Sequence, residues 1–209
     1  MKILLIDDQE VVRQGIRRVF EQNGSEFVFG ESGSGADALR VLREEKWDAA
    51  VLEICLRDCD GLELLKDIKR AQPELPILIF STHSEQQYAM RAFRAGAAGY
   101  LSKSATVQEL VNAITKTAAG GRYVSVDLAE RLVTHLERGT NGAPHEILSD
   151  REFEVFRWIA NGKTVGEIAE LLGLSDKTIS TYRARVLRKM GMKSNAELTH
   201  YAAHNQITK

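Results

Sequence analysis

Three acidic side chains, a hydroxyl and a lysine each stand where an apolar run of the sequence ends. In chain order they are Asp7, Asp8, Glu53, Ser81 and Lys103. Carboxylate oxygens are ligands that suit Mg²⁺, which usually shares its coordination sphere with phosphate oxygens. A lysine and a hydroxyl can bind the remaining phosphate oxygens. The residue types therefore indicate a site that holds a phosphoryl group beside a metal ion.

Five short apolar runs alternate with amphipathic stretches of helical length over the first half of the chain. The runs cover residues 2–7, 27–31, 49–55, 77–81 and 99–103, and the helical stretches cover 9–22, 35–45, 60–72, 84–95 and 107–119. This alternation predicts an α/β fold with a doubly wound, five-stranded parallel sheet. Ligands of such sheets bind beyond the carboxyl ends of the strands, so the five side chains are expected at one rim.

Each of these residues alone also has a purely structural explanation. Asp7 or Asp8 can cap the first helix, Glu53 can be a solvated strand end, and a single lysine is usually a surface residue. The occurrence of all five at successive strand ends favours a functional site.

Four motifs of this half resemble the receiver domain of bacterial two-component response regulators. They are DD at residues 7–8, DGLELL at 60–65, ST at 81–82 and GAAGYLSK at 96–103. The resemblance covers residues 1–120 and implies that a sensor histidine kinase is the phosphodonor. It implies that Ser81 and Lys103 contact the phosphoryl group and that Tyr100 senses activation. It also implies a Mg²⁺ ion bound by Asp7, Asp8, Glu53 and the backbone carbonyl of Cys55.

The sequence departs from the family pattern at two positions. Glu53 stands at the phosphoacceptor position, where the family has aspartate, and Arg57 replaces a proline that shapes a loop. The extra methylene of glutamate moves the carboxylate by about 1 Å, enough to disfavour phosphorylation. It also carries the carboxylate toward the phosphoryl position. We expect Glu53 to imitate the phosphorylated state weakly, reaching Lys103 or Ser81 but not both together with the metal.

The chain changes character after Gly120-Gly121. Residues 122–138 predict one further helix, with Leu128, Leu132 and Leu136 on one face, and residues 138–144 predict a flexible linker. The expected domains are 1–120, a linker region over 121–144, and a second domain over 145–209.

The second domain predicts four helices. Ser149, Thr164 and Ser194 each stand three residues before a glutamate, the pattern of a capping box at a helix start. Ser175 caps a longer helix that ends at Met190. The short helix 165–172, a turn at Gly173 and this longer helix have the order of a helix-turn-helix motif.

Positive charge is concentrated at this end of the chain. The net charge of the whole chain is −1, yet from Lys177 to Lys209 there are seven Lys and Arg residues against one Glu. A basic helix suits the major groove, where small side chains reach bases and cations reach phosphates. The sequence predicts double-stranded DNA as a partner; an ordinary bundle with a solvated basic helix is the alternative.

The stretch LSDREFEVFRWIANGKTVGEIAELLGLSDKTISTYRARVLRKM, within residues 145–209, resembles the LuxR/NarL-type DNA-binding domain. The resemblance implies binding to DNA as a homodimer, with the last helix, where Ala202 and Ala203 allow close approach, as the dimer surface. Three residues match base-facing positions: Ser180, Thr181 and Ala184. Six match backbone-contacting positions: Lys177, Thr178, Tyr182, Arg183, Arg185 and Lys189.

These features together predict a cytoplasmic, two-domain transcriptional response regulator. No apolar run is long enough to span a membrane, and Cys55 and Cys59 are expected to be reduced thiols. Two alternatives stay open: a regulator that works without phosphorylation, and a Mg²⁺-dependent phosphatase or phosphotransferase. The basic end of the chain has no role in the second.

Overall fold

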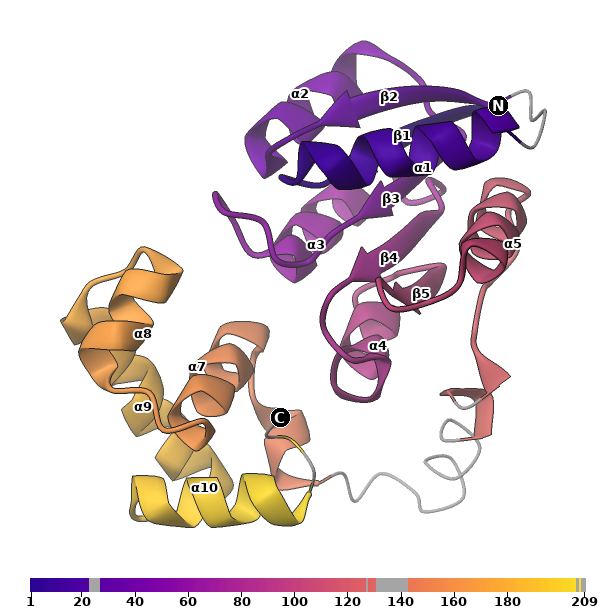
Figure 1. Ribbon diagram of the computed structural model, residues 1–209. Coiled ribbons are helices and arrows are strands. Elements are labelled where there is room, and N and C mark those ends of the chain that lie inside the picture. The colour runs from indigo at the N-terminus through magenta and orange to yellow at the C-terminus, as the bar shows by residue number, and fades with distance from the viewer. Residues whose placement is uncertain (23–26, 127, 131–142, 206, 208–209) are drawn as a thin grey trace. The chain divides into compact units, whose positions relative to one another are not determined.

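The computed structural model describes residues 1–22, 27–126, 128–130, 143–205 and 207. The chain divides into two compact units, Met1–Thr134 and His135–Lys209, which are coloured indigo to magenta and orange to yellow in Figure 1. The exact domain boundaries expected at residues 120 and 145 stay predictions.

The first unit is a five-stranded, wholly parallel sheet with strand order β2-β1-β3-β4-β5. Its strands are β1 (Lys2–Ile6), β2 (Val28–Ser32), β3 (Ala49–Leu52), β4 (Ile77–Ser81) and β5 (Gly99–Ser102). Its helices are α1 (Glu10–Gln22), α2 (Gly35–Glu44), α3 (Gly61–Ala71), α4 (Glu85–Arg94) and α5 (Val107–Ala118). The predicted α/β fold is confirmed.

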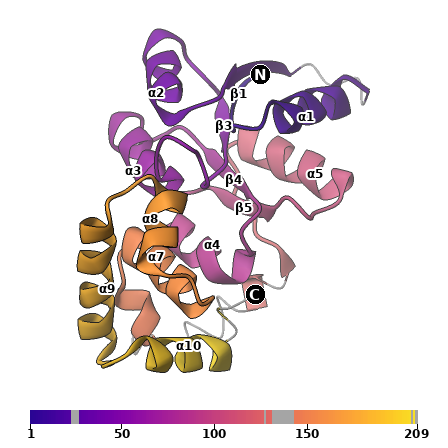
Figure 2. The same cartoon turned by 60° about the vertical axis from the view of Figure 1, so that its left-hand side comes forward.

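Helices cover both faces of this sheet. Figure 2 shows α1 and α5 on one side of the strands and α2, α3 and α4 on the other. Apolar side chains of β1, β3 and β4 pack with Ile16 and Phe20 of α1 and with Leu110 and Ile114 of α5. Strands buried on both faces can be apolar at every position, which is why β3 reads Ala-Ala-Val-Leu.

Strand β3 ends three residues earlier than the apolar run predicted. Beyond Leu52 the chain turns back, and Cys55 forms an antiparallel bridge with Asp60. The Asp60 side chain accepts hydrogen bonds from the backbone N–H groups of Leu62 and Glu63 and so caps α3. Glu53 is therefore the first residue of the loop that follows β3, directly at the carboxyl end of this central strand.

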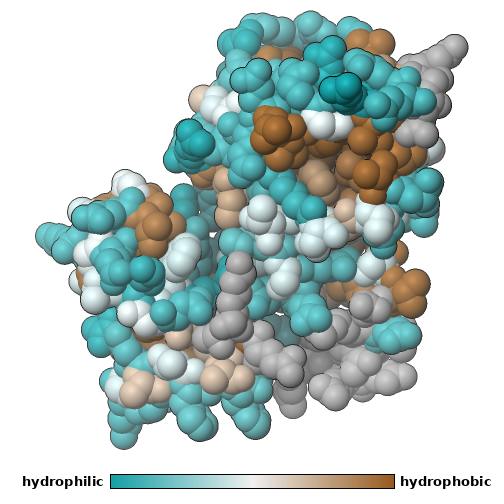
Figure 3. All heavy atoms as spheres, in the orientation of Figure 1, coloured by the Kyte–Doolittle hydropathy of each residue, from teal (hydrophilic) through white to brown (hydrophobic). Residues whose placement is uncertain are grey.

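The second unit is entirely helical. Its elements are the 3₁₀ turn η1 (Pro144–Ile147), α7 (Asp150–Ala160), α8 (Val165–Leu172), α9 (Asp176–Met190) and α10 (Asn195–His204). Gly173 and Gly191 end α8 and α9 with φ of 63° and 66°, a conformation that glycine adopts without strain. Hydrophilic residues dominate the visible surface of this unit in Figure 3.

Two of the three predicted capping boxes of this unit are complete, those that begin at Ser149 and Thr164. The third forms only in part. Ser194 accepts the backbone N–H of Glu197, but the Glu197 carboxylate accepts the N–H of Lys193 instead of that of Ser194. The helix still begins where predicted, because the hydrogen bond from the Glu197 N–H to the Ser194 side chain caps its start.

The helix predicted over 122–138 begins later than expected. Tyr123 lies in a parallel bridge with Gly99, which extends the sheet edge, while residues 126 and 128–130 are helical. Leu128 is buried. Leu132, Leu136 and the predicted linker up to residue 142 lie outside the described residues, so the shared helix face stays a prediction. Among the helices that are described, none combines the length and the apolar character needed to cross a membrane.

We expect Gly61→Ala to destabilise the receiver-like unit by about 1–3 kcal/mol. An added Cβ would lie 2.7 Å from the carbonyl oxygen of Glu53 and against the Cα of Ile54, both backbone atoms that cannot rotate away. Gly15→Ala is the matched control, since nothing lies within 4 Å of its Cβ and helix propensity predicts a gain of about 1 kcal/mol. Urea denaturation measures both; equal effects would contradict the prediction.

Candidate functional site

The side chains predicted from strand ends do meet at one rim of the sheet. Asp7 follows β1, Glu53 follows β3, Ser81 ends β4 and Lys103 follows β5, on four adjacent strands. The ammonium of Lys103 lies 2.6 Å from Asp7 Oδ2 and 2.8 Å from Glu53 Oε2. Asp7, Glu53 and Ser81 are all buried. One lysine thus bridges two buried carboxylates.

The Glu53 carboxylate accepts hydrogen bonds through both of its oxygens. Oε1 accepts from Ser81 Oγ at 2.5 Å and from the backbone N–H of Cys55 at 3.0 Å. Oε2 faces Lys103 and accepts the backbone N–H of Thr82 at 3.4 Å. Glu53 therefore contacts both Ser81 and Lys103. The sequence predicts that Glu53 cannot contact both of them while a metal ion is also bound.

Lys103 stays protonated despite its burial. Desolvation alone would lower its pKa, but the hydrogen bonds to Asp7 and Glu53 and their negative charges outweigh this and raise the pKa above its ordinary value. The rim accordingly holds a permanent internal cation between two of its acids.

The second aspartate, Asp8, has a partner that the sequence analysis did not anticipate. Arg57 Nε lies 2.8 Å from Asp8 Oδ2, while Asp8 Oδ1 is buried without a hydrogen-bond partner. The family comparison places a loop-shaping proline at position 57 and does not indicate this ion pair. The charge of Arg57, on the loop that follows Glu53 and opposite the acid pair, was the signal available in the sequence.

The side chains predicted to bind Mg²⁺ do not fit a metal ion in this arrangement. Among the described residues no group of three or more His, Cys, Asp or Glu side chains is placed to hold one. The reason is visible in their partners: Asp7 and Glu53 face Lys103, and Asp8 faces Arg57. Among the carboxylate oxygens of these three acids, only Asp8 Oδ1 has no hydrogen-bond partner and is available to a cation.

Tyr100, the predicted switch aromatic, is fully buried, and its hydroxyl donates to the carbonyl of His83 at 3.0 Å. Burial, chiefly, raises the pKa of Tyr100 far above its ordinary value, so the hydroxyl keeps its proton. His83 also stacks on Tyr88 and lies 2.8 Å from the Cys55 sulfur. The loop between β4 and α4 thus joins the Ser81 end of the rim to Tyr100.

The predicted recognition helix is α9, which packs against α7 and α8. Ile179 and Val186 are buried, and Leu187 is half-buried. Six residues of the predicted DNA-contacting set are exposed: Lys177, Ser180, Thr181, Ala184, Arg185 and Lys189. Thr178, Tyr182 and Arg183 are half-buried.

Two of the predicted phosphate-contacting cations already have protein partners. Lys189 Nζ lies 2.6 Å from Oε2 of Glu152, which is buried in α7. Arg183 Nε donates to Asn195 Oδ1 at 2.7 Å. Burial would raise the pKa of Glu152, but hydrogen bonds from Lys189 and Ser149 hold it below its ordinary value. Lys189 therefore ties α9 to α7, and a DNA contact by Lys189 stays a prediction.

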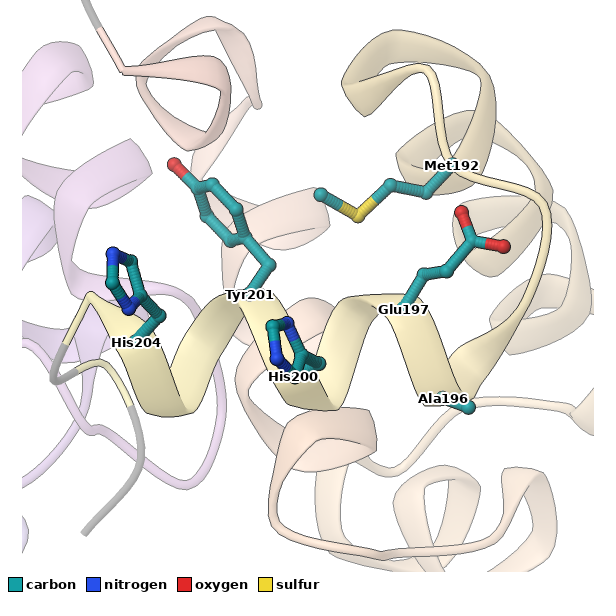
Figure 4. Close-up of a pocket in the computed structure, with 6 residues that line it drawn as sticks. All are labelled: Met192, Ala196, Glu197, His200, Tyr201 and His204. Atoms are coloured by element: carbon teal, nitrogen blue, oxygen red, sulfur yellow. The ribbon is translucent and has the colours of Figure 1, made fainter.

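Helix α10 carries an open groove of about 700 Å³, shown in Figure 4. It is lined by Met192, Ala196, Glu197, His200, Tyr201 and His204. Of the two alanines predicted to allow close helix approach, Ala202 is buried within its own unit and only Ala203 is exposed. Ala203 is therefore accessible to a dimer contact on α10, whereas Ala202 already packs inward.

Both units match known families. The family model described as the response regulator receiver domain matches residues 3–115. The model of the bacterial regulatory proteins of the LuxR family matches residues 146–202. Two models in this order correspond to the two structural units.

Curated relatives match this chain over nearly its whole length. Response regulator UvrY of Escherichia coli is 36% identical over 208 residues, which are 99% of this chain and 95% of the relative. Response regulator GacA of Pseudomonas aeruginosa is 34% identical over 206 residues, covering 98% and 96%. Among solved structures, RcsB of Salmonella enterica serovar Typhimurium, bound to the rprA promoter with phosphomimetic BeF₃⁻, has 26% identity and a TM-score of 0.65. That match covers 97% of this chain and 98% of RcsB.

We expect Lys189→Ala to destabilise the helical unit by about 1–2 kcal/mol, because it leaves the buried Glu152 without its cation. The exposed Arg185→Ala is the control and should change stability by less than about 0.5 kcal/mol. A carboxyl with a lowered pKa stabilises above its unfolded pKa and loses that contribution on acidification. The difference between Lys189→Ala and the parent should therefore shrink below about pH 4.5. Thermal unfolding against pH measures it; a pH-independent difference would contradict the ion pair.

Proposed function

The chain belongs to the response regulators that join a receiver domain to a LuxR-type DNA-binding domain, and from this premise we propose how it works. It binds DNA as a dimer, and Glu53 holds its receiver domain partway toward the active state without phosphorylation. A relative with aspartate at the same position would take phosphate from a sensor histidine kinase. In this chain the carboxylate of Glu53 permanently occupies the position that the phosphoryl group would take.

The contacts of Glu53 are the observation that carries this proposal. Ser81 and Lys103 are the two side chains that the receiver resemblance assigns to the phosphoryl group, and both contact Glu53. A carboxylate has two oxygens and one charge, whereas a phosphoryl group has three oxygens and a charge of about −1.5 to −2. The imitation is therefore partial, and a group shifts an equilibrium only by its differential contacts with the two states.

The route from Glu53 to the rest of the receiver runs through the loop after β4. Glu53 accepts from Ser81 and from the backbone of Thr82, and the next residue, His83, accepts the hydroxyl of Tyr100. A carboxylate that fixes Ser81 and Thr82 thus also fixes the acceptor that keeps Tyr100 inside. This chain of hydrogen bonds supports Tyr100 as the residue that reports occupancy of the phosphoryl position.

DNA recognition is assigned to the exposed face of α9. Ser180, Thr181 and Ala184 are small enough to approach base edges, while Lys177 and Arg185 can reach phosphates. Solved RcsB structures of similar fold include a complex with promoter DNA and a complex of two RcsB dimers with DNA. A twofold dimer reads twofold DNA, so we propose operators of two half-sites related by a dyad.

We expect Glu53→Asp to accept phosphate from a small acyl phosphate in the presence of Mg²⁺, because the shorter carboxylate leaves the phosphoryl position open. Before phosphorylation this variant should dimerise and bind DNA less well than the parent, and afterwards better. Phosphoprotein gels and sedimentation measure the two properties. Glu53→Gln, which keeps the length but loses the charge, is the matched control and should lose the parent's advantage.

Lys103→Ala in the parent should erase most of the same advantage, since it removes the cation that Glu53 faces. Phosphorylation of the parent as readily as of Glu53→Asp would refute the geometric argument. Equal dimerisation of the two unphosphorylated proteins would show that Glu53 is not an imitation of the phosphoryl group.

Substitutions on α9 should separate sequence reading from charge attraction. Arg185→Ala should weaken binding to all duplexes alike and reduce the slope of log affinity against log salt concentration by about one. Thr181→Ala should instead change the preference between sequences by about 1–3 kcal/mol at one base pair. Fluorescence anisotropy with a duplex series at several salt concentrations measures both effects. Arg40→Ala on α2 is a control that removes the same charge elsewhere; an equal loss there would refute the assignment of α9.

A further inference from the structure

Each carboxylate oxygen of Asp7 and Glu53 already has at least one hydrogen-bond or ion-pair donor from the protein. Glu53 accepts from Ser81 on one oxygen and faces Lys103 with the other. Asp7 accepts the backbone N–H of Gln9 through Oδ1 at 2.8 Å and faces Lys103 with Oδ2. A metal ion at these oxygens would compete with the Lys103 ammonium for both carboxylates, and a donor displaced without a new partner is costly.

Asp8 is the remaining acid, and Arg57 neutralises it. The guanidinium lies on the Oδ2 side of Asp8, and only Oδ1 has no partner. Mg²⁺ needs near-octahedral oxygen coordination, and proteins usually supply it through one or two carboxylates together with phosphate oxygens. A single carboxylate oxygen beside an arginine is a poor ligand set.

The charges at the rim point the same way. Lys103 and Arg57 set two positive charges against the three carboxylates of Asp7, Asp8 and Glu53. The rim is left with one net negative charge, so its attraction for a divalent cation is much smaller than that of three unpaired acids. Arg57 is highly exposed, with 84% of its side chain accessible, so substitution there should not disturb folding.

We infer that Lys103 and Arg57 together take the place of the divalent cation, so that this receiver works without Mg²⁺. Arg57 is a positioning residue that acts through Asp8. The inference deepens the proposed function and rests on it in one respect, because it takes Glu53 as the occupant of the phosphoryl position.

Calorimetric titration of the full chain with MgCl₂ tests the inference. The parent and Arg57→Lys, which keeps the charge, should show no binding at millimolar Mg²⁺. Arg57→Ala should bind at least about tenfold more tightly than the parent, because a like charge beside Asp8 is gone. Arg40→Ala, which removes another exposed arginine that pairs with acids on its own helix, should behave as the parent does.

The same substitutions in the Glu53→Asp background extend the test. Glu53→Asp alone should bind Mg²⁺, and addition of Arg57→Ala should tighten that binding by about tenfold, whereas addition of Arg57→Lys should not. Mg²⁺ binding by the parent as tight as by the double variant would overturn the inference. Equal Mg²⁺ binding by Arg57→Lys and Arg57→Ala would show that the charge of Arg57 does not cause the weak binding of the parent.

DNA binding by the parent, in chelator and in Mg²⁺ at matched ionic strength, separates this inference from the proposed function. The affinity should agree within about twofold in the two solutions, since salt effects on DNA binding are matched. Loss of binding only in chelator would overturn the inference. Absence of DNA binding in both solutions would refute the proposed function, while the metal titration would still decide the inference by itself.

Discussion

A half-buried lysine between two buried carboxylates is the contact around which the receiver domain is organised. Lys103 bridges Asp7 and Glu53 across the ends of β1, β3 and β5, with both short distances below 3 Å. Burial of these acids would be unfavourable without the cation, because an uncompensated charge in the interior costs several kcal/mol, on the order of 3–5. The parallel sheet makes the bridge possible by ending these strands at a common edge.

Because Glu53 is fixed by this bridge, the neighbouring loops are fixed as well. Ser81 and the backbone of Thr82 bind the same carboxylate, and Tyr100 binds the carbonyl of the next residue. The loop after β3 is tied in through the N–H of Cys55. A single side chain therefore connects three loops that carry separate motifs in the sequence, and a change at residue 53 should be felt in all of them.

The fold and the membership of the rim were predictable, because both follow from patterns that are local in sequence. Apolar runs gave the five strands, and Asp7, Glu53, Ser81 and Lys103 each end or follow one. Contacts between loops were not predictable. The pairing of Arg57 with Asp8 depends on loop conformation, which periodicity does not encode.

The DNA-binding domain shows the same division between local and distant interactions. The helix starts at Ser149 and Thr164 were predictable, since a capping box needs only four residues. The pairing of Lys189 with Glu152 joins residues 37 positions apart, and the inward side of Ala202 depends on how α10 packs on α7. The LuxR/NarL-type resemblance implies a phosphate contact for Lys189 and a dimer surface that includes Ala202, and it does not reveal these contacts within the unit.

Covalent chemistry gives the hydrogen bonds of Glu53 a consequence in time. A phosphorylated aspartate is an acyl phosphate, which water hydrolyses, so its signal expires. The carboxylate of Glu53 is attached through carbon–carbon bonds and is not hydrolysed, so under the proposed function the state it supports would last as long as the polypeptide. For such a regulator, proteolysis and dilution replace dephosphorylation as the means of switching off. With the proposed assembly of two copies on one operator, occupancy would respond more than proportionally to the number of molecules in the cell.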